Sequence, residues 1–426
     1  MKNVLFVSYF FPPLGGPGVQ RSVKFCKYLP KYGWNPIILT VKNVSYIAYD
    51  ESLLEEVPHC VIYRTGSCDI MRLLYLYEKL LKRDPTQSIY THASSKKKQF
   101  LRDIFPIDSK IGWISFAVRT GNKIIKKNKI DQIFSSVGPY SDAIIGYILS
   151  KKWNIPLIVD YRDLFVGSPD QSYFSQWHRR FAEKWENKVL DRAEKVIINT
   201  YRAKQRIQKL YPMINQEKFT VIYNGYDRED FLVHAARKET AEVSFTYTGG
   251  FYGERTPEFL IQAIIELNNA HALPQNVRFN FIGNYSKEIL LILQKKQLNN
   301  LIRVKPQISH ADAIKEMLKS DALMLFISHK DSEIVIPAKL FEYLAAKRPI
   351  LAMCPLDGEA ASLILHYRAG IVCETRDVKA IKDAIQFIIN HKLQGNLDTL
   401  ISSKNNDYSH FERSSQAKEL ANILDF

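Results

Sequence analysis

The chain has 426 residues, of which 46% are hydrophobic, and it carries 59 lysines and arginines against 44 acidic residues. This length predicts two or three domains with large cores, and the composition excludes general disorder. The net charge of +15 predicts an anionic partner: nucleic acid, anionic lipid headgroups or a phosphorylated ligand. The five cysteines are scattered and form no C-x-x-C pair, which argues against metal clusters and disulfide frameworks and favours a reducing cytoplasm.

The first residues, "MKNVLFVSYFFPPLGG", have an apolar run that ends at two prolines without a small-residue cleavage site. We therefore interpret them as a buried strand and not as a signal peptide. No uncharged stretch reaches the length of a transmembrane helix. A protein that is soluble or attached to the surface of a membrane is expected.

Residues 1–228 alternate between apolar strands and helices. "KNVLFVSYFF" and "WNPIILTVK" flank the helical segment "GVQRSVKFCKYLPKYG", and the theme recurs in "DQIFSSVG", "SDAIIGYILSKKWN" and "PLIVDYRD". Strand, glycine loop, helix and strand in this order are typical of parallel βαβ units. A doubly wound, Rossmann-like first domain is predicted.

A second domain of the same kind follows. Residues 229–242 are polar with weak periodicity and are interpreted as a linker, and the alternation resumes over 243–405 with "VSFTYTGGF", "TPEFLIQAIIELNNA" and "VRFNFIGN". Residues 406–426 end in an amphipathic helix that is a candidate for crossing back to the first domain. Two open α/β domains predict a ligand cleft between them, with ligands beyond the carboxyl ends of the strands.

Two glycine loops are candidate binding sites for a negatively charged group. In "FFPPLGGPGVQR", Gly15 and Gly16 lie between a strand and a helix, and in "YTGGFYGERTPEF", Gly249 and Gly250 end the first strand of the second domain, with Arg255 shortly before a helix. Glycine lets the backbone approach an anion, and a helix start offers free N–H groups. Neither loop matches a G-x-G-x-x-G or P-loop pattern. Plain strand-to-helix turns and an exposed loop arginine are the competing interpretations.

The stretch "VDYRDLF" places Asp160, Arg162 and Asp163 directly after an apolar strand. At the carboxyl end of a sheet these side chains are candidates for orienting an acceptor. An arginine–aspartate pair that braces the edge of the domain is an equally good interpretation.

The stretch "EIVIPAKLFEYLAAKRPIL" predicts a helix with Pro337 at its first position. Lys339 then lies in the first turn, where the helix dipole favours anions. Lys339 and Glu342 are candidates for contacting a diphosphate and a ribose diol, with Glu333 close by. An ordinary i, i+3 ion pair between Lys339 and Glu342 is the alternative.

Basic and aromatic residues alternate between Tyr75 and Lys129, as in "YLYEKLLKRD" and "KIGWISFAVRTGNKIIKKNK". This pattern suits a helix lying on an anionic membrane, and Trp113 and Phe116 favour that interpretation. The alternative is a solvated face on a helix that packs in the core.

Taken together, these stretches resemble the family 4 (group 1) glycosyltransferases, which have the two-domain GT-B fold. The likeness covers nearly the whole chain and is carried by "SYFFPPLGGPGVQR", "VDYRDLF", "VIYNGYD", "YTGGFYGERTPEFLIQAI", "DALMLFI" and "PAKLFEYLAAKRPIL". It implies a retaining, metal-independent transfer of a sugar from a nucleotide-sugar donor, with no further cofactor. The acceptor would be a cell-surface polysaccharide or a lipid-linked glycan, and the site of action the cytoplasm or the inner face of the cell membrane.

The resemblance also implies roles for individual residues. Arg255 lies eight residues before Ala263, as the family's phosphate-binding lysine does, and Glu342 matches the second glutamate of the family's E-x7-E motif, which binds the ribose. The implied catalytic residues are Glu333, Lys339 and Arg255. The implied donor-binding residues are Gly15, Gly16, Gly249, Gly250, Arg255, Lys339, Leu340 and Glu342, and the implied acceptor-side residues are Asp160, Arg162 and Asp163.

Several positions depart from the family pattern. The first glutamate of the E-x7-E motif would fall at Ile334, with Glu333 one residue away, and Gly250 replaces an arginine that often follows the first glycine of "TGG". We expect Lys339 to compensate by neutralising the diphosphate. Asp142 lies near the place where some relatives have a histidine, and no general base is assigned.

Two other functions compete with a transferase. A nucleotide-sugar epimerase of the same fold would need no separate acceptor surface. A non-catalytic protein that binds nucleic acid or another anion would use the +15 charge, but no nucleic-acid-binding module is recognisable and the glycines cluster at strand ends. We therefore expect no nucleic-acid partner.

Overall fold

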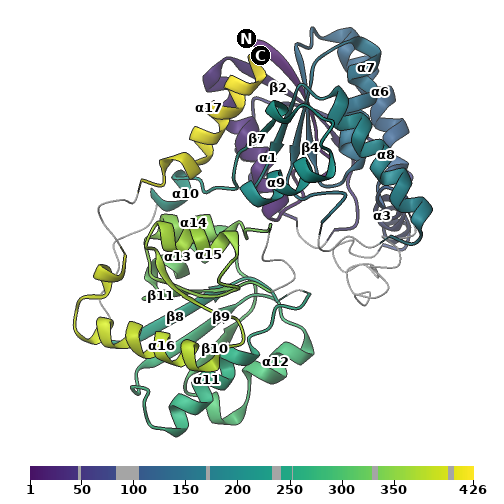
Figure 1. The fold of residues 1–426 in the computed structure, drawn as a ribbon. Helices are drawn as coiled ribbons and strands as arrows, with labels where there is room; N and C mark the ends of the chain where they lie inside the picture. The colour runs from purple at the N-terminus through teal and green to yellow at the C-terminus, as the bar shows by residue number, and fades with distance from the viewer. Residues whose placement is uncertain are drawn as a thin grey trace. The chain divides into compact units, whose positions relative to one another are not determined.

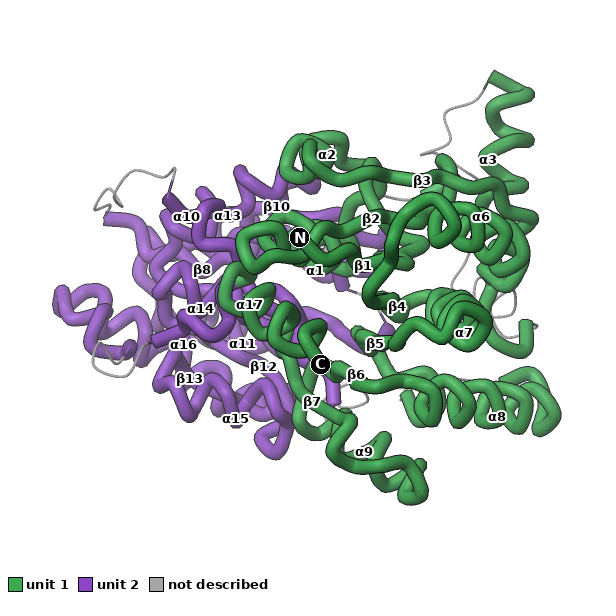
Figure 2. Tube along the Cα trace, turned by 90° about the horizontal axis from the view of Figure 1, so that it is seen from above, with its two compact units in different colours: residues 1–224, 413–426 green, residues 225–412 purple. Residues whose placement is uncertain are grey.

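The structure, a computed structural model, describes residues 1–46, 49–82, 105–168, 173–232, 241–251, 253–328, 334–401 and 407–426. The chain forms two compact units (Figure 2). Unit 1 consists of Met1–Asn224 and Arg413–Phe426, and unit 2 consists of Gly225–Glu412. The segment expected to be a linker, 229–242, begins with the short helix α10 (Glu229–Leu232) and belongs to unit 2.

Unit 1 is built on a seven-stranded sheet in the order β3-β2-β1-β4-β5-β6-β7, and each neighbouring pair is parallel. The chain leaves β1 toward β2 and β3 and later returns to the other side of β1 with β4. This reversal between β1 and β4 is the switch point at which open α/β sheets bind ligands. The strands are β1 (Lys2–Val7), β2 (Trp34–Val41), β3 (Val61–Thr65), β4 (Gln132–Val137), β5 (Leu157–Tyr161), β6 (Lys195–Ile198) and β7 (Phe219–Val221).

Helices cover both faces of this sheet, with α6, α7 and α8 on one side and α1 and α17 on the other (Figure 2). Because both faces are covered, the central strands are buried along their whole length: all of β4 and β5 is buried, including the polar residues Ser135, Ser136 and Asp160. The helices of unit 1 are α1 (Pro17–Tyr28), α2 (Ser52–Glu55), α3 (Ile70–Leu80), α6 (Ile114–Lys127), α7 (Ser141–Trp153), α8 (Gln176–Arg192), α9 (Tyr201–Leu210) and α17 (Arg413–Leu424), with short 3₁₀ helices at Leu29–Tyr32, Ile111–Trp113 and Gln216–Lys218.

The final helix, α17, is part of unit 1 although it follows unit 2 in the sequence (Figure 1). The side-chain amide of Gln416 donates to the carbonyl oxygens of Tyr223 and Asn224 at 3.0 and 3.1 Å. The amide of Gln132, in β4, donates to the carbonyl of Leu424 at 3.0 Å. These bonds attach both ends of α17 to the sheet of unit 1.

Unit 2 has a six-stranded parallel sheet in the order β10-β9-β8-β11-β12-β13, with its switch point between β8 and β11. In Figure 1, α13, α14 and α15 lie on one side of this sheet and α11 and α16 on the other. The strands are β8 (Val243–Thr248), β9 (Val277–Ile282), β10 (Ile302–Lys305), β11 (Ala322–Phe326), β12 (Ile350–Met353) and β13 (Gly370–Cys373). The remaining helices are α11 (Glu258–Asn269), α12 (Lys287–Leu293), α13 (His310–Lys319), α14 (Lys339–Ala346), α15 (Glu359–His366) and α16 (Val378–Leu393), with 3₁₀ helices at Lys296–Leu298, Leu397–Leu400 and Ser409–Phe411.

The core of unit 2 lies between the sheet and the helices α11 and α16. Phe245 of β8 stacks on Phe279 of β9 with ring centroids 4.9 Å apart. Together the two sheets confirm the predicted α/β fold of two doubly wound, Rossmann-like units. None of the helices in the described part of the chain is long and apolar enough to cross a bilayer.

Trp113, which the sequence suggested as a membrane contact, is a core residue of unit 1. Its side chain is fully buried, and its indole N–H donates to Thr65 Oγ1 at 2.7 Å. The basic residues around Trp113 favour a position at the surface. That interpretation is wrong for Trp113, because its ring packs on Tyr9 in the interior.

Candidate functional site

In unit 2, the predicted site residues gather where β8 ends and α14 begins. β8 ends at Thr248 and is followed by Gly249 and Gly250, while α14 begins at Lys339. The sequence predicted that the helix begins at Pro337. Instead, the carbonyl oxygen of Pro337 accepts from the N–H of Leu340 at 3.0 Å, so the chain enters the helix through a tighter turn and Lys339 is its first residue.

The amine of Lys339 points back to the strand and not along its own helix. Its Nζ donates to the carbonyl oxygen of Thr248 at 2.6 Å and lies 4.1 Å from the ring centroid of Tyr247. Lys339 and Glu342 form no ion pair, so the simple surface-pair interpretation does not describe this lysine. The tyrosine hydroxyl in turn donates to the carbonyl of Gly250 at 2.8 Å, which ties the glycine loop to the same group.

The surroundings of Lys339 disfavour its positive charge. Burial, and after it the nearby charge of Arg255, lowers the pKa of Lys339 to about 7, although Glu342 acts in the opposite direction. Arg255 lies in the loop before α11 and is partly buried. Two cationic side chains therefore share one partly desolvated position, an arrangement that an anionic ligand would stabilise.

Gly249 makes this position of the lysine amine sterically feasible. Its φ is +127°, which side chains of L-residues rarely adopt, and a Cβ built on it would lie 2.4 Å from Lys339 Nζ. The sequence identified this glycine from its place after a strand. The structure adds the reason that a larger residue does not fit.

Glu342 has a partner that sequence reasoning missed. His310, the first residue of α13, donates from Nε2 to Glu342 Oε1 at 2.9 Å. The two residues are 32 positions apart and meet because both α13 and α14 begin at the carboxyl edge of the sheet. His310 could have been found from the sequence as the first residue of the helix that follows β10.

The other residues implied for unit 2 have different placements. Glu333 lies outside the described residues. Ile334, where the family pattern has its first glutamate, is 5% exposed. Leu340 is fully buried in unit 2, so its side chain contributes packing.

In unit 1, Asp160 pairs with an arginine of α1. Arg21 donates to both carboxylate oxygens of Asp160, at 2.9 and 2.7 Å, and both side chains are fully buried. Arg21 also donates to the carbonyl oxygens of Tyr223 and Ile222 at 2.6 and 3.0 Å. The pair joins α1, the end of β5 and the chain after β7.

Arg162 is a second brace at this edge. Its guanidinium donates to the carbonyl oxygens of Gly18, Gly138 and Val137 and is 9% exposed. It therefore connects the start of α1 with the loop after β4, while Asp163 is exposed. The predicted glycine loop leads into this region: Gly15 is buried, and Gly16 has a φ of +97° and precedes the first residue of α1.

A buried acidic cluster lies at the β1–β4 switch point, and the sequence reasoning singled out only Asp142 of it. The hydroxyl of Tyr9 donates to Asp69 Oδ2 at 2.9 Å, and the backbone N–H of Tyr9 donates to Asp142 Oδ2 at the same distance. Asp108 accepts from the backbone N–H of Ser141 at 2.7 Å. Burial raises the pKa of Asp108 and raises that of Asp142 well above the usual range of a carboxyl group.

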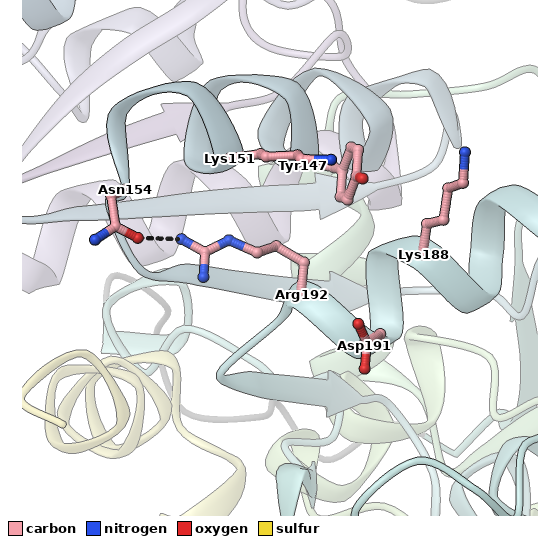
Figure 3. Close-up of a pocket in the computed structure, with 6 residues that line it drawn as sticks. All are labelled: Tyr147, Lys151, Asn154, Lys188, Asp191 and Arg192. Carbon is pink, nitrogen blue, oxygen red and sulfur yellow. Dashed lines mark hydrogen bonds between the residues drawn. The ribbon is translucent and has the colours of Figure 1, made fainter.

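A surface hollow of about 300 Å³ lies elsewhere on unit 1 (Figure 3). Arg192, which lines the hollow, donates to Asn154 Oδ1 at 3.5 Å and to Ser150 Oγ at 2.9 Å. The hollow lies where α7 and α8 end, at the amino edge of the sheet, and therefore opposite the edge at which such folds bind ligands. Its lining residues are Tyr147, Lys151, Asn154, Lys188, Asp191 and Arg192.

Comparison with protein families gives two matches that together cover most of the chain. The family model described as glycosyltransferase family 4 matches residues 71–230, and the one described as glycosyl transferases group 1 matches residues 242–391. No curated protein sequence matches the chain.

Several solved structures resemble the whole chain at low sequence identity. Sucrose-phosphate synthase from Thermosynechococcus elongatus has a TM-score of 0.64 at 14% identity, covering 100% of this chain and 98% of its own. WaaG, a glycosyltransferase involved in lipopolysaccharide biosynthesis, has a TM-score of 0.63 at 11% identity, covering 99% of both chains. A UDP-N-acetylglucosamine 2-epimerase has a TM-score of 0.53 at 11% identity, covering 95% of this chain and 92% of its own. At these identities the likeness shows the fold, which transferases and an epimerase share.

Proposed function

This chain belongs to the family 4, group 1 glycosyltransferases of the GT-B fold, and on that premise we propose that it is a retaining enzyme that needs no metal ion or other cofactor. It transfers a sugar from a nucleotide-sugar donor to a cell-surface polysaccharide or a lipid-linked glycan. The observation that carries the proposal is the amine of Lys339, which lies beside a positive-φ glycine at the carboxyl end of β8.

The donor diphosphate is the anion that suits this position. Lys339 and Arg255 supply positive charge, and Gly249 lets a phosphate approach the backbone. A bound diphosphate raises the pKa of Lys339 again, so the amine is protonated when the C1–O bond to the leaving nucleotide breaks. Negative charge develops on the leaving diphosphate in the transition state. Positive groups that already lie beside it stabilise this charge, and no side chain has to move during the reaction.

Glu342 contacts the ribose in this proposal. A carboxylate accepts hydrogen bonds from the two hydroxyls of a diol, and the bond from His310 fixes the orientation of the carboxylate. Glu333 stays a predicted sugar contact. The side chain of Leu340 packs in the core, so its donor-binding contribution is to hold the start of α14.

Unit 1 binds the acceptor. Asp160 and Arg162 act there as positioning residues, because each is buried and bonded to other parts of unit 1, whereas Asp163 is exposed at the carboxyl edge and is the candidate for direct contact. The loop of Gly15 and Gly16 borders the same edge. The transfer takes place in the cytoplasm, at the inner face of the membrane that carries the lipid-linked acceptor.

A thermal-shift screen of nucleotide sugars tests the donor assignment, because a ligand that binds the native state raises its melting temperature. The matching donor should raise the Tm of the wild type, and Glu342→Gln should reduce this rise. His310→Ala should reduce it less, and the exposed Lys379→Met on α16 should leave it unchanged. The transferase assignment is wrong if the enzyme interconverts two free nucleotide sugars with no acceptor, or if no nucleotide sugar shifts the Tm while random duplex DNA binds in a salt-sensitive manner.

A further inference from the structure

Helix α3 turns an apolar stripe outward. Leu73, Leu76, Tyr77 and Leu80 follow the spacing i, i+3, i+4, i+7 and so share one face of the helix, and their exposed fractions are 52, 45, 53 and 81%. The opposite face is buried and contains Glu78, whose carboxylate accepts from the hydroxyl of Ser45. A surface helix of a soluble domain ordinarily has the reverse arrangement.

Among the described residues of α3 and its end, the exposed charges beside this stripe are positive. Lys79 and Lys82 are exposed, and Arg72 is partly exposed with its guanidinium over the ring of Tyr75. Glu78, the acidic residue of α3, is directed inward. The outer surface of α3 therefore combines leucines, a tyrosine and cations, which is the composition of helices that lie in the interface of an anionic membrane.

A second exposed aromatic group lies at the start of α8. Phe174 and Trp177 are 58% and 60% exposed, and Trp177 stacks on Phe181 with ring centroids 5.2 Å apart. Arg179 and Arg180 are exposed beside them. In Figures 1 and 2, α3 and α8 both lie on the right of unit 1, and Figure 2 shows α6 and α7 between them. Tryptophan and tyrosine rings favour the headgroup level of a bilayer.

We propose that this side of unit 1, formed by the stripe of α3 and the aromatic start of α8, docks on the surface of a membrane rich in anionic lipid. The inference rests on the proposed function in one respect, since it assigns a specific surface to the expected membrane attachment. A second copy of the chain fits the stripe less well, because an interface of α3 with α3 would bring the cations of both copies together. Docking on lipid, in contrast, buries the leucines and pairs the cations with headgroups.

Vesicle sedimentation with the full-length protein tests the proposal. The wild type should bind vesicles of phosphatidylcholine and phosphatidylglycerol, bind less as salt rises, and bind vesicles of phosphatidylcholine alone weakly. The double variant Leu76→Glu, Leu80→Glu should lose at least about tenfold in partition, since it removes two leucines that docking would bury in lipid and adds charges that anionic lipid repels. Leu291→Glu on α12 of unit 2 is the matched control, because Leu291 is 75% exposed, and it should bind like the wild type.

Tryptophan fluorescence gives a second readout. Brominated lipids should quench the wild type, and Trp177→Phe should reduce the quenching. Trp177 is the most exposed of the five tryptophans, because Trp34 and Trp113 are buried and Trp153 and Trp185 are half-buried. The proposal is overturned if the wild type does not bind anionic vesicles, which would mean that the stripe is covered by the chain's own residues. It is also overturned if the double variant binds as well as the wild type or instead changes the molecular mass in solution. Donor turnover with a water-soluble acceptor should be unchanged in the double variant, which separates a failure of docking from a failure of the proposed function.

Discussion

Replacing Lys339 by methionine should stabilise the protein and impair its activity at the same time. Methionine keeps the length and apolar body of the side chain but removes the amine. The fall of the Lys339 pKa from its ordinary value near 10.5 to about 7 corresponds to about 5 kcal/mol against the charged amine. This figure is an upper bound, because the residue is partly exposed and water screens part of the effect.

The lost hydrogen bond to the Thr248 carbonyl opposes this gain by about 1 kcal/mol. A net stabilisation of about 1–3 kcal/mol remains at neutral pH, which for a unit of this size raises the Tm by roughly 2–10 °C. The gain should shrink as the pH rises from 7 to about 10.5. In this window the unfolded lysine still binds a proton that the native one has released, so the wild type gains stability with pH and the variant does not.

Activity should change in the opposite direction. Removing one preorganised cationic donor from a leaving diphosphate costs about 3–4 kcal/mol, or a factor of about 10² to 10³ in kcat. Calorimetric melts at pH 7 and pH 10 and a donor-turnover assay measure the two effects, with Lys379→Met as the control. A variant that is less stable than the wild type at pH 7, or one that keeps full turnover, would refute our view of Lys339 as a cation positioned for an anion.

Three further substitutions test the surrounding geometry. Gly249→Ala should displace the Lys339 amine and lower donor turnover at least about tenfold. Gly253→Ala is the control and should retain turnover, because Gly253 also has a positive φ but a Cβ there meets nothing within 4 Å. Equal losses in both variants would show that backbone strain alone lowers turnover. Asp160→Asn should lower the free energy of unfolding by about 3–5 kcal/mol in thermal or urea melts, because it leaves the buried charge of Arg21 uncompensated, and a near-neutral result would contradict the structural role of the pair. Asp142→Asn should become progressively more stable than the wild type as the pH rises above about 4, because the unfolded carboxyl then ionises while the native one stays protonated. A difference in Tm between the variant and the wild type that stays constant from pH 4 to 8 would show that the pKa of Asp142 is ordinary.

The place of the candidate residues in the fold was predictable from the sequence, because strand, glycine and helix recur with a regular spacing. Gly249, Lys339 and Glu342 all lie at the carboxyl edge of the second sheet, where the pattern predicted them. This success depends on local information: apolar runs specify strands, and parallel strands align their carboxyl ends. Neither inference requires knowing which side chains touch.

The partners of these side chains were not predictable, because they come from distant parts of the chain. Lys339 bonds to Thr248, 91 positions away, and Asp160 pairs with Arg21, 139 positions away. The sequence suggested nearer partners, Glu342 and Arg162, which are close along the chain but engaged elsewhere. Trp113 shows the same limit, since it is buried among distant residues and its indole bonds to Thr65, 48 positions away.

The two units differ in the charge that they place at their switch points. At the carboxyl edge of unit 2, burial and a neighbouring arginine lower the pKa of Lys339 to about 7, so a negatively charged ligand would stabilise its ammonium form. At the carboxyl edge of unit 1, burial raises the pKa values of Asp108 and Asp142 and so disfavours their ionised forms. The shared fold therefore provides one edge at which burial disfavours a cation and another at which burial disfavours two carboxylates. This difference suits the proposed reaction, in which unit 2 binds the diphosphate of the donor and unit 1 binds the hydroxyl of the acceptor.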